Sequence, residues 1–166
     1  MENDMANHEA KDSKPLKYLT VQDVLWINLE LTKKVRHFRF AKLEEATYYQ
    51  YGYGGSRDLA LQAGRFLSGF MKLRPLDAGN EATAFVGAVA FLFLNGARLS
   101  VSDSEGAEWV EQVRTGKIRA EESLPISMCP CHGEGAKVAD AVADVLGLFP
   151  KTIAELLNHD ESLAAS

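Results

Sequence analysis

The sequence predicts an all-α fold, and three observations support this fold class. Eleven consecutive apolar or small residues span Ala84–Leu94, and a helix that is apolar on every side belongs in the centre of a domain, surrounded by other helices. Several other segments repeat apolar residues at three- and four-residue spacings, as amphipathic helices do. The chain has 166 residues, of which 46% are hydrophobic and 25% charged, as expected for one ordinary globular domain.

Composition excludes several functional classes. The formal net charge of -5 argues against a nucleic-acid binder, which is usually basic. The central apolar run is too short for a bilayer, which needs about 20 residues, and no N-terminal segment resembles a signal peptide. Two cysteines separated by one residue indicate no disulfide framework. We therefore expect a cytoplasmic protein without a membrane partner, with residues 1–16 as a disordered tail and residues 17–160 as the domain.

The first elements follow from capping and periodicity. Thr20 with Asp23 three residues later is typical of a capped helix, which we expect to run to about Lys34. A basic cluster at Lys33–Phe40 is either a solvated helix end or a site for an acidic partner or a phosphate. A short helix is expected at Leu43–Thr47.

The next interval is aromatic and rich in glycine, and a longer helix follows it. Tyr48–Gly55 lacks the lysine and the βαβ context of a phosphate-binding glycine loop. Ser56–Lys72 is expected to be a helix, because its apolar residues fall on one face. These residues are Leu59, Ala63, Phe66, Leu67, Phe70 and Met71.

The second half of the chain predicts a turn-rich connection and more helices, about seven in all. The connection is Ala97–Gly106, in which Asp103 and Glu105 are the next carboxylates downstream of the central helix. The expected helices are Ala107–Thr115, Ile118–Leu124 and Ala136–Phe149, the last stopped by Pro150, with a short turn or helix at Thr152–Asn158.

Pro125–Gly135 contains Cys129, Cys131 and His132 within a Cys-Pro-Cys-His run. Thiolates and imidazole suit zinc, so a metal site is one interpretation. It requires a fourth ligand, from His159, from a carboxylate or from a second chain. An ordinary irregular loop without metal is the alternative.

The residues around the central helix resemble the core motif of the Fic/Doc (Fido) family, in particular its death-on-curing branch. That motif reads H-P-F-x-D-G-N-K-R-T-A and leads into an apolar helix that ends in L-N-G. The matching positions are Pro75, Gly79, Asn80, Thr83, Ala84 and Leu94–Gly96; Tyr18–Val24 is similar to the family's opening Y-L-T-x-x-D-V, and Gly116–Ile118 with Glu121 and Glu122 is similar to a late helix.

The departures from the motif fall on the family's reactive positions. Arg74 stands at the catalytic histidine, Ala78 at the metal-binding acid, Glu81 at the lysine and Ala82 at the phosphate-binding arginine. The family's active members transfer AMP or phosphate to a protein hydroxyl, which requires a base, a metal ion and a cation. Arginine stays protonated at working pH and cannot be the base. We therefore expect no catalytic residue and no cofactor.

The resemblance implies two binding sites. Gly79 and Asn80, with Arg74 and Asp77 nearby, are expected to bind an anion or nucleotide through backbone N–H groups; alternatively, Gly79-Asn80 only begins the helix. The family's flap, which docks a target peptide as an added β-strand, corresponds to Tyr49, Tyr51 and Tyr53. The alternative there is a glycine loop whose tyrosines pack on the domain.

The leading expectation is a Fic/Doc-like binding or regulatory protein without transferase activity. Its partner would be an antitoxin-like peptide, a phosphate or nucleotide, or a second copy of the chain. One rival is a transferase with a rebuilt site that uses Asp77 and Arg74 together with ATP and magnesium. A structural remnant without any ligand is the other.

Overall fold

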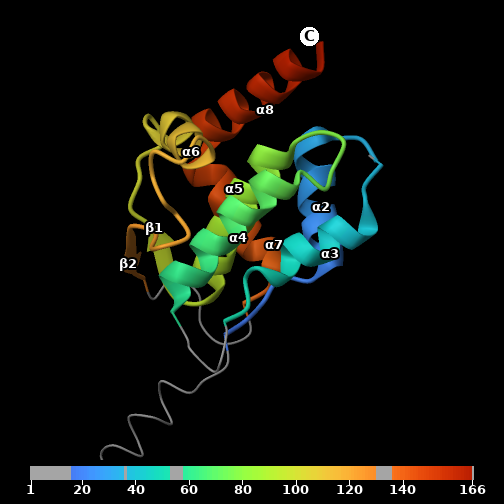
Figure 1. The fold of residues 1–166 in the computed structure, drawn as a ribbon. Coiled ribbons are helices and arrows are strands. Elements are labelled where there is room, and N and C mark those ends of the chain that lie inside the picture. The colour runs from blue at the N-terminus through green and yellow to red at the C-terminus, as the bar shows by residue number, and fades with distance from the viewer. Residues whose placement is uncertain (1–15, 36, 53–57, 130–135, 166) are drawn as a thin grey trace, which may run out of the picture.

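The computed structural model describes residues 16–35, 37–52, 58–129 and 136–165, with side chains described up to His159 in the last range. These residues form seven helices and one two-stranded sheet (Figure 1), which confirms the all-α prediction. In chain order the elements are α2 (Val21–Thr32), α3 (Phe40–Tyr48), α4 (Leu59–Leu73), α5 (Asn80–Leu94), β1 (Ala97–Leu99), α6 (Gly106–Arg114), β2 (Ile126–Met128), α7 (Val138–Leu148) and α8 (Pro150–Ala165).

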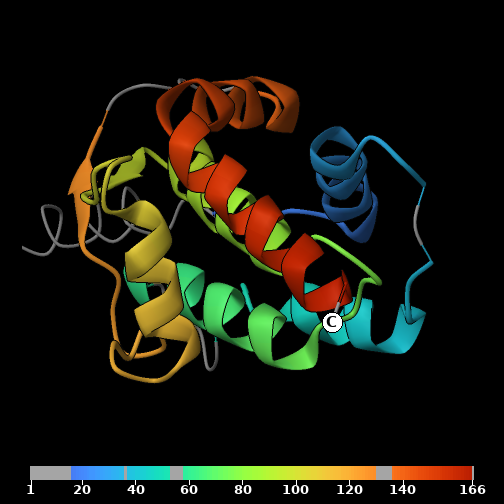
Figure 2. The ribbon, with the colours of Figure 1, turned by 90° about the horizontal axis from the view of Figure 1, so that it is seen from above.

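Helix α5 is the centre of the molecule. Every residue from Asn80 to Leu94 is buried, and α5 packs against α2, α4, α7 and α8 and against β1. Figure 2 shows α8 lying over α5, with α4 and α7 on either side. The apolar run therefore forms the core helix that its composition predicts. Among the described residues, no helix combines the length and the apolar character needed to cross a membrane.

The starts of α2 and α4 are determined by local side-chain caps. The Asp23 N–H donates to Thr20 Oγ1 (3.1 Å), while the Thr20 N–H donates to Asp23 Oδ2 (2.8 Å), which completes the predicted capping box. At α4 the Leu61 N–H donates to Asp58 Oδ1 (3.1 Å), so this helix begins at Leu59 rather than at Ser56.

The prediction of a helix at Ile118–Leu124 is wrong. Gly116 adopts φ 84° after the end of α6, and the chain continues in turns until Pro125. Ala120 is fully buried, and its carbonyl lies against Gly64 of α4, where an added Cβ would meet the Ala120 oxygen at 1.8 Å. Backbone contact with α4 replaces the expected helix here.

Strands β1 and β2 form an antiparallel pair that the sequence does not predict. Ala97 pairs with Met128, Arg98 with Ser127 and Leu99 with Ile126. Each strand has only three residues, which is too short for an alternating pattern to be recognised. The pair joins the chain after α5 to the chain before α7.

Helix α8 is longer than the short element expected at Thr152–Asn158. Pro150 ends α7 as predicted, but it is also the first residue of α8, a position where proline loses no hydrogen bond. Asp103 caps this helix from outside, because its carboxylate accepts the N–H groups of Thr152 (2.8 Å) and Lys151 (3.1 Å).

Candidate functional site

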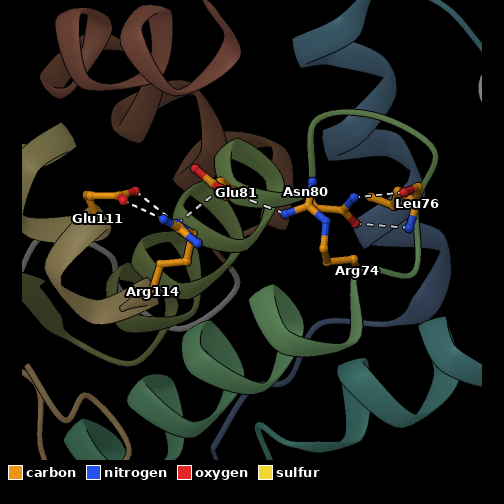
Figure 3. A network of polar contacts seen from close by, with 6 residues as sticks. All are labelled: Arg74, Leu76, Asn80, Glu81, Glu111 and Arg114. Atoms are coloured by element: carbon orange, nitrogen blue, oxygen red, sulfur yellow. Dashed lines mark hydrogen bonds and ion pairs between the residues drawn. The ribbon is translucent and has the colours of Figure 1, made fainter. Parts of the chain in front are cut away.

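The loop between α4 and α5 is closed by the side chain of Asn80. Asn80 Nδ2 donates to the Leu76 carbonyl (2.7 Å), and Asn80 Oδ1 accepts the Leu76 N–H (2.9 Å). Leu76 also forms a β-bridge with Phe38. Both ends of the Asn80 amide are thus used inside the loop (Figure 3).

Gly79 is the N-cap of α5 and adopts φ 75°, a conformation that suits glycine. A Cβ at this position would lie 2.9 Å from Thr32 Cγ2 and 3.0 Å from Asn28 Nδ2. Gly79 and Asn80 are both buried. Glycine is therefore required here by both the backbone conformation and the close approach of α2.

Glu81 lies in the first turn of α5 and is 1% exposed. Its Oε1 lies 3.7 Å from Arg74 Nη1 and 3.8 Å from Arg114 Nε, one arginine on each side (Figure 3). Within the described residues neither Glu81 oxygen accepts a hydrogen bond. The carboxylate is thus held by two ion pairs and by the positive end of the helix dipole.

Two further elements bring charged groups to Glu81. On α6, Arg114 Nε donates to Glu111 Oε2 (2.9 Å) and Arg114 Nη2 donates to Glu111 Oε1. On α8, His159 stands close enough that one ligand atom each from Glu81, Glu111 and His159 lie within 4.8 Å of one another. We call Arg74, Glu81, Glu111, Arg114 and His159 the charged cluster.

The two carboxyl groups of the charged cluster have opposite pKa shifts. Burial raises the pKa of Glu81, although the positive charges of His159, Arg114 and Arg74 partly oppose it. The hydrogen bonds from Arg114 lower the pKa of Glu111. Of the two carboxyl groups, Glu81 therefore holds a proton more readily than Glu111.

Glu81, Glu111 and His159 offer the oxygen and nitrogen ligands that divalent metals accept. However, the guanidinium groups of Arg74 and Arg114 already balance the two carboxylates. A metal ion here would have to lie beside both guanidinium groups, whose repulsion disfavours it. The donor atoms fit a metal, but the surrounding charges do not.

Of the residues expected at the anion site, only Arg74 belongs to the charged cluster. It ends α4 with φ 45°, and its carbonyl accepts the Arg39 guanidinium. Asp77 is exposed, and its N–H donates to the His37 carbonyl (3.1 Å). Glu105 is exposed before α6.

The expected flap is described only in part. Tyr49 packs on α4 at Gly69, where an added Cβ would meet its ring at 2.4 Å. The Tyr51 ring lies 4.3 Å from that of Tyr18. Both contacts are those of tyrosines that pack on the domain, whereas Tyr53 lies outside the described residues.

The zinc hypothesis concerns residues that are also only partly described. Cys129 is disulfide-bonded, and zinc is bound by a free thiolate; Cys131 and His132 lie outside the described range. The Cys129 N–H donates to the Gly96 carbonyl, beyond the C-terminal end of α5. His159 lies at the opposite end, about 20 Å away along the helix, so it does not supply the fourth ligand.

Glu111 and Arg114 were not foreseen as members of a site, and His159 was foreseen only as a fourth ligand for zinc. The i, i+3 spacing of Glu111 and Arg114 on an expected helix is a local signal for their ion pair. No local signal connects either residue to Glu81 or His159, because α6 and α8 reach α5 only through tertiary packing.

Comparison with known proteins identifies no relative. No family model matches the chain, and neither the curated proteins nor the solved structures contain a match. The resemblance to the Fic/Doc family therefore stays a prediction.

Proposed function

We propose that this chain is a Fic/Doc-like binding protein without transferase activity. The observation that carries the proposal is the Glu81 carboxylate, buried at the N-terminus of α5 between Arg74 and Arg114. In the family that the chain resembles, phosphate groups bind at the corresponding end of the helix. The carboxylate takes the place of such an anion, because it already uses the helix dipole and both guanidinium groups.

The same arrangement opposes phosphoryl chemistry. A second anion at this helix end would meet the negative charges of Glu81 and Glu111. Arg74, at the family's histidine position, is a permanent cation paired with Glu81 and does not accept a proton. The proposal therefore assigns the protein a binding role, with an antitoxin-like peptide or a second copy of the chain as partner and the cytoplasm as location.

The test compares wild type with Glu81→Ala by thermal unfolding in millimolar phosphate, AMP or ATP. Wild type is expected to show no shift in Tm. Glu81→Ala removes the buried carboxylate from between Arg74 and Arg114 and from the N-terminus of α5, so phosphate should raise the Tm of this variant by binding there in the folded state. Glu108→Ala removes a carboxylate from α6, away from the N-terminus of α5. It is the matched control and should behave as wild type.

The outcomes separate the alternatives. Transfer of label from ATP to a protein by the wild-type chain would overturn the proposal. If neither wild type nor Glu81→Ala responds to any anion, Glu81 does not replace a bound anion, and the structural remnant becomes the better interpretation.

One observation favours the enzyme alternative. His159 lies beside Glu81 and Glu111, and a histidine among carboxylates is an arrangement suited to acid–base catalysis. This alternative predicts magnesium-dependent label transfer from ATP that His159→Ala abolishes. If Asp77→Ala abolished the transfer while His159→Ala retained it, the rebuilt site would instead lie on the loop before α5.

A further inference from the structure

A hollow of about 420 Å³ lies between α6 and the segments next to the two-stranded sheet. Ser100 and Val101 follow β1 and Pro125 precedes β2, and the Ser100 N–H donates to the Pro125 carbonyl (2.8 Å), which fixes this wall. The volume falls within the range of about 300–1,000 Å³ that is common for small-molecule sites. Glu111 and Arg114 of α6 do not border the hollow. It is therefore separate from the charged cluster and independent of the proposed function.

The opposite wall is one face of α6 and its N-cap. The residues that border the hollow from this side recur at three- and four-residue spacings, which places them on the same face of a helix. They are Glu105, Glu108, Trp109 and Gln112. Trp109 is half-buried and packs against the core. The core contact holds the indole in place where it borders the hollow.

The charge around this hollow is negative. Glu105 and Glu108 are exposed, and none of the described residues that border the hollow is basic. In the part of the chain that the structure describes, neither carboxylate accepts a hydrogen bond or forms an ion pair. The hollow thus combines an indole with two carboxylates that have no cation of their own.

An indole and two carboxylates around one small volume select an organic cation, because cations are attracted both to the face of a tryptophan and to carboxylate oxygens. A guanidinium group suits this set better than an ammonium group. It is planar and weakly hydrated, it stacks on aromatic rings, and it donates two parallel hydrogen bonds to one carboxylate. We propose that the hollow binds the guanidinium group of an arginine side chain, which stacks on Trp109 and donates to Glu105 and Glu108.

The first experiment compares the amides of N-acetylarginine, N-acetyllysine and N-acetylcitrulline on the wild-type chain by NMR titration at low salt. Citrulline has nearly the shape of arginine but no charge, so we expect the arginine compound to bind about fivefold more tightly. The lysine compound should bind with intermediate affinity. Arginine should shift the indole N–H signal of Trp109 and leave that of Trp26, on α2, unchanged. Equal affinities for arginine and either analogue, or no response to millimolar arginine compound, would overturn the proposal.

Free L-arginine, titrated in the same way, distinguishes two sources of the guanidinium group. Its α-carboxylate would lie near the carboxylates of Glu105 and Glu108, which repel it. Tighter binding of the capped compound supports the site with an arginine inside a peptide as its occupant. Tighter binding of free arginine supports the same site with the amino acid itself as its occupant.

The second experiment assigns the contacts to residues. The double variant Glu105→Gln/Glu108→Gln should abolish the preference for arginine over citrulline, whereas Trp109→Leu should abolish the preference for arginine over lysine. Glu45→Gln, an exposed acid-to-amide change on α3, is the control and should keep both preferences. If Trp109→Leu fails to fold, the double variant still decides, because both of its positions are exposed. An undiminished preference for arginine over citrulline in the double variant would refute the assignment.

Discussion

The Glu81 carboxyl group is buried and is balanced by guanidinium groups 3.7 and 3.8 Å away. Burial raises its pKa above the usual 4.5, so the folded chain binds a proton there more readily than the unfolded chain. Stability from this group is consequently present at low pH and is lost as pH rises from 4.5 through the raised pKa.

The direction of this pH dependence of stability gives the first prediction. Glu81→Gln removes the ionisation, so its free energy of unfolding relative to wild type should increase as pH rises from 4.5 towards neutrality. Urea unfolding across that pH range measures it. Glu111→Gln should change little relative to wild type over this range and should gain on wild type only as pH falls below 4.5, because Arg114 lowers the pKa of Glu111 and wild type loses that stabilisation on acidification. Parallel curves for the two variants would contradict the pKa shifts.

Gly79 gives the second prediction. Gly79→Ala puts a side chain at φ 75° and against Thr32 and Asn28, so we expect a loss of about 1–3 kcal/mol in the free energy of unfolding. Gly147→Ala is the matched control, because its Cβ meets nothing within 4 Å in helix α7. The free energy of unfolding of Gly147→Ala should increase by up to about 1 kcal/mol. Urea denaturation of both variants measures the difference, and equal effects would show that Gly79 is not conformationally required.

At the scale of elements, α8 depends on a cap that lies 48 residues earlier in the chain. Burial on its own raises the pKa of Asp103, but the N–H groups of Thr152 and Lys151 outweigh it and lower the pKa. The ionised carboxylate therefore stabilises the start of α8 above about pH 4, and this contribution is lost as pH falls. Since α8 also carries His159, the same cap helps to place the charged cluster.

The third prediction follows from this cap. Asp103→Ala should lower the free energy of unfolding by about 1 kcal/mol. It should also accelerate amide hydrogen exchange at the start of α8 at neutral pH. Hydrogen exchange followed by mass spectrometry makes the measurement. Glu105→Ala, two residues further along the loop, should leave exchange in α8 unchanged. Similar acceleration in both variants would show that the loop, and not the cap, holds α8.

At the scale of the whole molecule, α5 connects the other elements. It contacts four helices and β1, so loss of packing around α5 should unfold the described domain as one unit. Phe91 is a suitable probe because it is fully buried and its ring lies 5.8 Å from that of Tyr18.

The fourth prediction uses this probe. Phe91→Ala should lower the free energy of unfolding by about 3–5 kcal/mol, with coincident urea transitions by circular dichroism and by tryptophan fluorescence. Phe40→Ala, at a position that is 59% exposed, should change it by less than about 0.5 kcal/mol. Separate transitions for the two probes would show that α5 does not unite the domain.

Much of the fold follows from local patterns. The apolar run at Ala84–Leu94 identifies α5, and Thr20 with Asp23 identifies the start of α2. Ile118–Leu124 contradicts its local pattern, because burial of Ala120 against Gly64 of α4 determines its path. Local propensity decides an element only where no such long-range contact competes with it.

The sequence by itself determined the all-α class and the core helix, because spacing and residue type suffice for these. Only the tertiary structure brought Glu111, Arg114 and His159 to Glu81. Their meeting depends on how α6 and α8 pack at the N-terminus of α5, across separations of up to 78 residues. Packing of distant elements is decided by the whole core, and no local pattern of residues contains that information.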